Sequence, residues 1–448
     1  MIRHWLVPVY LLACLLLGGA SAAGFVANLV LQLMALPLAG WSLWQISHQG
    51  LKLSCSIRAL LLIATLLIVV ALVQLLPLPP AIWTALPGRR TVVENYHLLG
   101  VTLPWLPLTL APEAALASLL WLLPAFAVLL GMVAGGFRGR NIAVVLVVVA
   151  LVSVVLGALQ MLGGGAYFYR FTNYGFAVGF FANANHNATL LLVTIPFLAA
   201  LGTTLLSKRA SARSASAIRL LIGSGYAVIG VGLLLNGSLA GIGIGVPVTM
   251  ATWLTFGRMQ LSIRRRMGAL AILLSIAAVW FIAVNPGNNL FGIQRENVEL
   301  SRQTSFALTL RAAGEYFPIG SGIGSFQPVY RTQEPLISVG GTFMNHAHSD
   351  WLELLLETGL AGVVLAVTFL GWWGLRVRAI WRAEQSERFA HAAIIATFAM
   401  MLHSVVDYPL RTVALSAVFA MCLSLMAGVR PLVIKHRHQT RARHLKIQ

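Results

Sequence analysis

The chain has 448 residues, of which 58% are hydrophobic and only 10% are charged, and its formal net charge is +19. A water-soluble globular protein would not carry so many apolar residues. A transmembrane β-barrel would alternate apolar and polar residues instead of showing long apolar runs. The composition therefore predicts a polytopic α-helical membrane protein.

Apolar runs close to the ~20 residues that a helix needs to cross a bilayer recur along the chain. They predict an all-α fold with about twelve transmembrane helices. The predicted spans are 5–21, 25–46, 57–76, 114–134, 141–162, 187–206, 218–235, 239–257, 268–285, 351–374, 391–406 and 411–429. We expect a single membrane domain, because the sequence shows no internal repeat and no separate soluble module.

Four parts of this domain follow in order along the chain. Residues 1–285 hold the first nine spans, and 286–350 form a large outer loop that we expect to cap the bundle. Residues 351–429 hold the last three spans, and 430–448 form a basic tail.

The basic residues predict the orientation of these spans. When both termini lie on the same side, that side receives 23 of the 31 lysine and arginine residues. By the positive-inside rule this side is cytoplasmic. The basic tail resembles a nucleic-acid-binding arm, but we expect it to lie against anionic lipid headgroups and predict no nucleic-acid partner.

Ionisable residues are concentrated in the segment 345–359, NHAHSDWLELLLETG. Asp350 followed three residues later by Glu353 predicts a helix start with Asp350 as the N-cap. Asp350, Glu353 and Glu357 share one helix face, which should point into the bundle or a water-filled cavity because carboxylates are destabilised in hydrocarbon. Two plainer roles stay open, namely helix capping by the first two acids and a buried hydrogen bond of Glu357.

Two histidines, His346 and His348, precede this helix. The pair could bind a metal ion, but no cysteine or HExxH-type partner joins it, so we predict neither a metal nor another cofactor. An imidazole is suited to proton transfer at neutral pH because its reference pKa is about 6.5. The alternative is that both are ordinary loop histidines.

The outer segments contain more arginine than the positive-inside rule predicts. These residues are Arg295, Arg302, Arg311 and Arg331 in the loop 286–350, and Arg170 in the segment 163–186. A guanidinium group binds phosphate through a fork of donors, so the arginines indicate a diphosphate or phosphoglycan site. The alternative is ion pairing with glutamates of the same loop, which are Glu296, Glu299, Glu315 and Glu334. The glycines of GSGIGSF could let backbone amides approach an anion.

Three segments together resemble the O-antigen ligase / O-antigen polymerase superfamily of membrane glycosyltransferases. The first is 300–362, which contains SRQTSFALTLRAAGEYFPIGSGIGSF and NHAHSDWLELLLETGLAG. The others are GFFANANHNATLLL at 179–192 and HSVVDYPLRTVALSAVFA at 403–420. The chain departs from the family pattern at Ser349, where members often have asparagine, and at Leu239, where many have arginine.

The resemblance implies an inverting, metal-independent glycosyl transfer at the periplasmic face of the bacterial inner membrane. The implied donor is an undecaprenyl-diphosphate-linked glycan, and the acceptor hydroxyl belongs to lipid A–core in a ligase or to a second lipid-linked glycan in a polymerase. The implied base or positioning residue is His348, supported by His346, Asp350 and Glu357.

The remaining roles also follow from the resemblance. The donor diphosphate is assigned to Arg302, Arg311, Arg331 and Arg170, and the glycan or acceptor to Asn183, Asn185 and His186. The alternative function is a membrane transporter or flippase of lipid-linked glycans or anions. That alternative predicts ionisable groups near the bilayer midplane and repeated halves.

Overall fold

The computed structural model describes residues 5–22, 25–48, 51–137, 139–163, 165–207, 211–257, 261–284, 302–336, 344–383 and 387–428. The predicted basic tail and Arg295 lie outside these residues. Among the described residues, the strands are confined to the antiparallel pair β1 (Pro77–Leu78) and β2 (Leu106–Pro107), and the remaining regular structure is helical. The predicted all-α class is therefore confirmed.

Eight helices in the described part of the chain are long and apolar enough to cross a membrane. They are α2 (Val26–His48), α3 (Cys55–Val73), α6 (Pro112–Gly135), α7 (Gly139–Gly163), α8 (Ala184–Ser207), α9 (Ala212–Asn236), α10 (Leu239–Phe256) and α14 (Asp350–Arg382). The other four predicted spans fall on helices whose apolar parts are shorter. These are α1 (Leu6–Leu17), α11 (Leu261–Val284), α15 (Arg388–His403) and α16 (Val413–Gly428). A multi-pass membrane protein is thus confirmed, whereas the number of twelve spans stays a prediction.

The short separator NGS at 236–238 divides two full helices, as predicted. Gly237 ends α9 with φ +67°, a left-handed conformation that glycine adopts without a side-chain clash. The Ser238 hydroxyl then accepts a hydrogen bond from the Gly241 amide at 3.0 Å and caps α10. Because Gly237 ends α9 and Ser238 caps α10, three residues are enough to separate the two helices.

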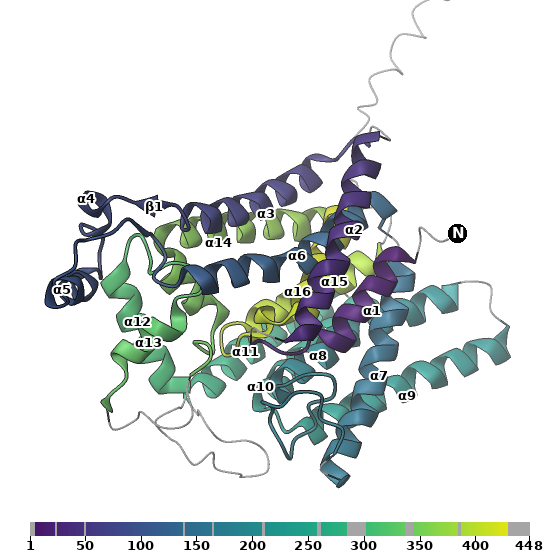
Figure 1. Ribbon diagram of the computed structural model, residues 1–448. Helices are drawn as coiled ribbons and strands as arrows, with labels where there is room; N and C mark the ends of the chain where they lie inside the picture. Colours follow the sequence, from purple (N-terminus) through teal and green to yellow (C-terminus); the bar gives the residue numbers. More distant parts are fainter. Residues whose placement is uncertain are drawn as a thin grey trace, which may run out of the picture.

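The helices form one bundle (Figure 1). Its centre is α8, which is the most buried span and packs against α7, α9, α10 and α15. A second group is formed by α6 with α2 and α16, and by α14 with α3. In Figure 1 the helices α3, α6 and α14 run side by side.

Several short elements gather at the end of the bundle where α14 begins. The connection from α3 to α6 contains α4 (Pro80–Trp83) and α5 (Arg90–Leu98), and the loop before α14 contains α12 (Arg302–Tyr316) and α13 (Phe326–Gln333). Tyr316, Phe326 and Tyr330 form a separate small core against Leu356 of α14. The described part of the loop 286–350 is therefore fixed to the bundle, and its location in the periplasm stays a prediction.

Candidate active site

The start of α14 is capped one residue earlier than we predicted. The hydroxyl of Ser349, not the carboxylate of Asp350, accepts the hydrogen bond from the Leu352 amide. The Asp350 carboxylate instead accepts hydrogen bonds from the Ser404 hydroxyl at 2.7 Å and from the Leu410 amide at 3.2 Å. Because Ser349 performs the cap, Asp350 is available to bind the hairpin between α15 and α16.

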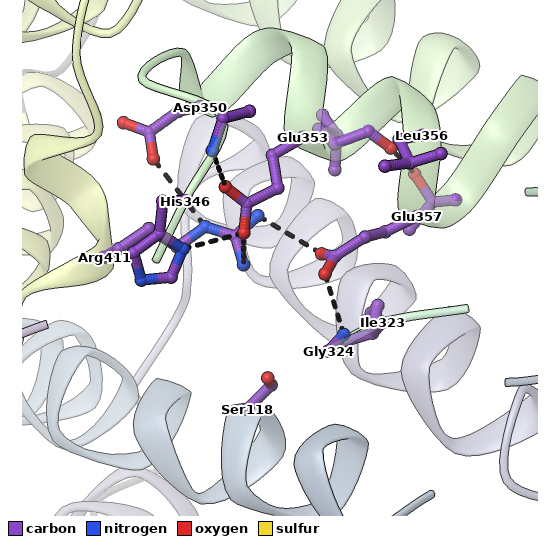
Figure 2. Close-up of polar contacts among 12 residues, drawn as sticks. Ser118, Ile323, Gly324, His346, Asp350, Glu353, Leu356, Glu357 and Arg411 are labelled. Carbon is purple, nitrogen blue, oxygen red and sulfur yellow. Dashed lines mark hydrogen bonds and ion pairs between the residues drawn. The ribbon is translucent and has the colours of Figure 1, made fainter. Parts of the chain in front are cut away.

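The carboxylates of α14 converge on Arg411, the last residue of the 3-10 helix η4 (Pro409–Arg411) (Figure 2). The guanidinium nitrogens lie 3.3 Å from Glu353 Oε1, 3.3 Å from Glu357 Oε2 and 3.7 Å from Asp350 Oδ1. Glu353 and Glu357 are only 1% and 2% exposed. The prediction that this acidic face points into the bundle is confirmed, and the burial is possible because a cation lies in the same place.

Arg411 is held in its charged form by this environment. Its guanidinium nitrogens lie within 3.7 Å of carboxylate oxygens of Glu353, Glu357 and Asp350, and negative charges at these distances favour the protonated form. Three carboxylates therefore share one permanent positive charge. By formal charge, three carboxylates outnumber the one guanidinium group that they face.

The glycine run before α13 supports this cluster from the other side. Gly320, Gly322 and Gly324 all have positive φ, and the Gly324 amide donates a hydrogen bond to Glu357 Oε1 at 2.8 Å. The Gly322 amide donates to the main-chain oxygen of Glu357 at 2.9 Å. The expected approach of backbone amides to an anion thus occurs, and the anion is a carboxylate of the chain itself. We assign no bound phosphate to this loop.

This loop also fits a break in α14. Gly359 has φ +54° and ψ −135°, and a Cβ atom placed there would lie 2.2 Å from the Pro318 carbonyl oxygen. The Leu360 amide donates to that same oxygen at 2.8 Å. The break lets the chain segment 318–324 lie directly against α14, which positions Glu357.

The two histidines of the motif take different partners. His346 Nδ1 lies 2.9 Å from Glu353 Oε1, and its Nε2 lies 3.5 Å from the main-chain oxygen of Ser21. His348 Nδ1 lies 3.5 Å from Asp407 Oδ1. Both rings contact the ring of Tyr408, with centroid separations of 4.6 Å and 5.1 Å. His348 also has φ +53°, a sparsely populated conformation that often occurs at functional sites.

Asp407 joins His348 to the segment around α8. The Asn185 amide nitrogen donates to Asp407 Oδ2, and Asn185 Oδ1 accepts from the Ser238 hydroxyl at 2.7 Å. His186 is 1% exposed and lies edge-on to Tyr408 at 5.0 Å, and neither of its ring nitrogens has a hydrogen-bond partner among the residues that the structure describes. The side-chain oxygen of Asn183 accepts a hydrogen bond from the main-chain amide of Asn185 at 2.9 Å. The 179–192 segment and the histidine motif, far apart in the sequence, therefore meet at the hairpin.

The predicted phosphate-binding arginines are dispersed. Arg311 is exposed and lies 3.7 Å from Glu315 one helical turn away, which is the ion pairing that we considered as the alternative. Arg170 is exposed and lies over the Phe171 ring at 5.8 Å, and Arg331 is an exposed residue of α13. Arg302 is the first residue of α12, and its side chain lies outside the described structure.

The backbone nevertheless brings the start of α12 to the histidine motif. Ser305, one turn after Arg302, donates a hydrogen bond from its hydroxyl to the main-chain oxygen of Ala347 at 3.2 Å. Ala347 lies between the two histidines. Arg302 therefore lies on the chain three residues before a side chain that bonds the motif.

A cavity of about 610 Å³ opens beside the acidic cluster. Its long body is lined by apolar side chains of α3, α6, α14 and α16, among them Leu67, Phe126, Phe369 and Phe419. At one end it is lined by Arg411, the three carboxylates and His346, together with Ser21, Gln327 and Asn345. Among the described residues, the lining includes His346 and not His348, and it includes none of Arg170, Arg311 and Arg331.

Sequence reasoning missed Arg411, Asp407 and Tyr408. A signal was present, because the predicted topology puts Arg411 in an outer hairpin, where the positive-inside rule disfavours arginine. The pattern HSVVDYPLR also places a negatively charged residue, Asp407, and a positively charged one, Arg411, between two apolar runs. Charged residues in such a place indicate a buried partner or a site.

One comparison with known proteins found a match to a family model over part of the chain. Residues 224–367 match the family model described as O-Antigen ligase. The matched range extends from α9 into α14 and includes the glycine loop and the histidine motif, whereas Asp407 and Arg411 lie beyond it. The comparison with curated proteins found no match. The family match confirms the resemblance that the sequence motifs indicated.

Proposed function

We propose that this chain, whose residues 224–367 match the model of the O-antigen ligase family, transfers a glycan from undecaprenyl diphosphate to a sugar hydroxyl at the periplasmic face of the bacterial inner membrane. The transfer inverts the configuration at the anomeric carbon and uses no metal ion. The acceptor is lipid A–core for O-antigen ligation or a second lipid-linked glycan for polymerisation. Both belong to lipopolysaccharide or exopolysaccharide synthesis.

The observation that carries this proposal is the amphiphilic cavity. Its lining on α6 extends from Ala114 to Leu129, which is about 22 Å of helix at 1.5 Å per residue. That length covers most of the hydrocarbon core of a bilayer, which is about 30 Å thick. A long apolar cavity with one polar end has the shape and polarity of a site for a polyprenyl chain joined to a hydrophilic head.

The diphosphate belongs outside the acidic cluster in this arrangement. Arg411 already faces three carboxylates, and a diphosphate beside them would meet like charges. The N-terminal end of α12 lies next to Ala347 and carries Arg302. Helix N-termini and guanidinium groups both favour phosphate. We therefore assign the diphosphate first to Arg302, with Arg170, Arg311 and Arg331 as further candidates.

The proposed step balances without a cofactor. The acceptor hydroxyl gives its proton to His348 while its oxygen forms a bond to the anomeric carbon. The bond from that carbon to the phosphate oxygen breaks, and its electron pair leaves with undecaprenyl diphosphate. Asp407, 3.5 Å from His348 Nδ1, would stabilise the imidazolium that forms. Asn183, Asn185 and His186 remain candidates for the acceptor side, because the Asp407 network joins them to His348.

The test is transfer by the purified chain with a lipid-linked glycan donor and an acceptor. We expect His348→Ala to lower the transfer rate by about 100-fold or more, the usual contribution of a general base. His97→Ala is the matched control, because His97 lies on α5 in another outer connection. Transfer by His348→Ala at the rate of the unaltered chain would contradict the assignment of the base.

The same assay with the chain reconstituted in lipid vesicles separates transfer from transport. A transporter or flippase would move lipid-linked glycan across a vesicle membrane without forming a new glycosidic bond. If the unaltered chain moves the donor but yields no product with lipid A–core or with a second lipid-linked glycan, the transferase proposal fails.

A further inference from the structure

Three neutral polar side chains line the cavity at its polar end. Ser21 lies between α1 and α2, Gln327 is the second residue of α13, and Asn345 precedes the histidine motif. They form a chain of hydrogen bonds, in which Gln327 Nε2 donates to Asn345 Oδ1 at 2.8 Å and Asn345 Nδ2 donates to the Ser21 hydroxyl at 3.2 Å. Three elements that are distant in sequence thus meet at the cavity through their side chains.

These side chains retain unused hydrogen-bonding capacity. Each amide has two N–H donors and an oxygen acceptor. Among the described residues, Gln327 Nε2 donates to both the side-chain and the main-chain oxygen of Asn345, whereas Asn345 Nδ2 donates once, to Ser21. One N–H group of Asn345 and the Gln327 side-chain oxygen have no partner among these residues. All three side chains are half-buried and border open space. Donors and acceptors fixed by one another at a cavity wall are suited to recognise the hydroxyl or acetamido groups of a sugar.

The group lies next to a histidine of the motif. Asn345 immediately precedes His346, and the main-chain oxygen of Ser21 lies 3.5 Å from His346 Nε2. A sugar bound by the amides would therefore be adjacent to the imidazole. The charged cluster lies next along the chain, at Asp350 and Glu353. The polar end thus contains a neutral part and an acidic part.

We propose that Ser21, Gln327 and Asn345 form the subsite for the sugar nearest the diphosphate in the lipid-linked donor, and that they select this sugar by its hydroxyl or acetamido groups. The proposal rests on the proposed function, because the lipid tail in the apolar body of the cavity is what brings that sugar to the polar end. It assigns the first sugar of the donor to residues different from those proposed for the acceptor.

The experiment measures binding of two lipids to the full-length chain by native mass spectrometry. One is a bare polyprenyl diphosphate, and the other carries a single N-acetylhexosamine on the same diphosphate. We expect Gln327→Ala to weaken binding of the sugar-bearing lipid about tenfold, the effect of one lost hydrogen bond, and to leave binding of the bare lipid within twofold. Ser21→Ala, which removes only a hydroxyl group, should act in the same direction.

Gln333→Ala is the matched control. Gln333 lies on the same helix, α13, and its amide bonds the exposed carboxylate of Glu315 at 2.9 Å, so neither affinity should change. Equal weakening of both lipids by Gln327→Ala, or no weakening of either, would overturn the sugar subsite. If the unaltered chain binds neither lipid, the proposed function itself fails, which is a different outcome.

Discussion

The hairpin between α15 and α16 contributes to two buried polar centres that are balanced in different ways. On one side Arg411 faces three carboxylates of α14 at 3.3–3.7 Å. On the other side Asp407, which is fully buried, accepts hydrogen bonds from the Asn185 side chain and the Tyr408 amide and lies beside His348. The first centre lines the cavity, and the second surrounds the histidine that we propose as the base.

The difference indicates a division of roles. Ion pairs that are withdrawn from water depend strongly on each partner, because removal of one leaves the others as uncompensated charges. A carboxylate held by amide donors can instead exchange its charge for a neutral amide of the same shape at a smaller loss of stability. We therefore expect the arginine centre to determine whether the cavity forms, and the Asp407 centre to determine how His348 reacts.

Loss of Arg411 should have the largest effect on stability. Arg411→Met leaves Asp350, Glu353 and Glu357 without their shared cation, and we expect the fold to lose about 3–5 kcal/mol of stability. Thermal unfolding in detergent measures this as a lower midpoint. Arg311→Ala is the control, because its ion pair with Glu315 is exposed and contributes less than about 1 kcal/mol. Equal midpoints for the two variants would show that the carboxylates do not depend on Arg411.

A smaller effect is expected where the glycine loop supports the same centre. Gly359→Ala places a Cβ atom 2.2 Å from the Pro318 oxygen at a positive φ, so the loop must move away from α14. We expect a loss of about 2 kcal/mol, seen again as a lower unfolding midpoint. Gly314→Ala is the matched change, because nothing lies within 4 Å of that position in α12, and it should leave the midpoint unchanged or raise it. A midpoint for Gly359→Ala no lower than that of Gly314→Ala would contradict the proposed support.

Local periodicity was sufficient to predict one half of the arginine centre. The spacing of Asp350, Glu353 and Glu357 places them on one helix face whatever the rest of the fold does, and the cost of burying a carboxylate in hydrocarbon directs that face inward. Arg411 is 54 residues from Glu357 in the chain, so no helical spacing links them. The cap was misplaced by one residue because Ser349 and Asp350 are both good capping residues, and only the distant Ser404 and Leu410 decide between them.

The contacts of the site residues also depend on parts of the chain that are distant in sequence. His348 was predicted from its motif, but its contacts with Asp407 and Tyr408 depend on the packing of the hairpin against α14. The arginines were grouped because they share a loop, yet the structure separates exposed Arg311 from the end of α12 that touches the motif. Residues that share a loop do not always share a site, because nine residues of α12 hold positions 302 and 311 about 14 Å apart along the helix.

The smallest change we consider concerns Asp407 and tests the second centre directly. Asp407→Asn keeps the shape of the side chain and can still present an oxygen to Asn185, but its NH2 group then replaces the oxygen that accepts from the Tyr408 amide. The unfolding midpoint should therefore fall, but by less than in Arg411→Met. The variant removes the negative charge 3.5 Å from His348 Nδ1, and an opposite charge at that distance favours the protonated imidazole. Without it the imidazolium formed during transfer is less stable, and we expect the maximal rate to fall about tenfold.

The pH dependence of this variant has a definite sign. If transfer needs a neutral imidazole, rates decline as pH falls and His348 takes up a proton. Removing the Asp407 charge makes that proton bind less tightly, so the acid limb of the pH–rate profile should move to lower pH. A merely structural role for Asp407 would lower the rate at every pH and leave the limb in place. A shift of the limb, with an unfolding midpoint above that of Arg411→Met, would therefore separate the centre that tunes the base from the centre that holds the cavity.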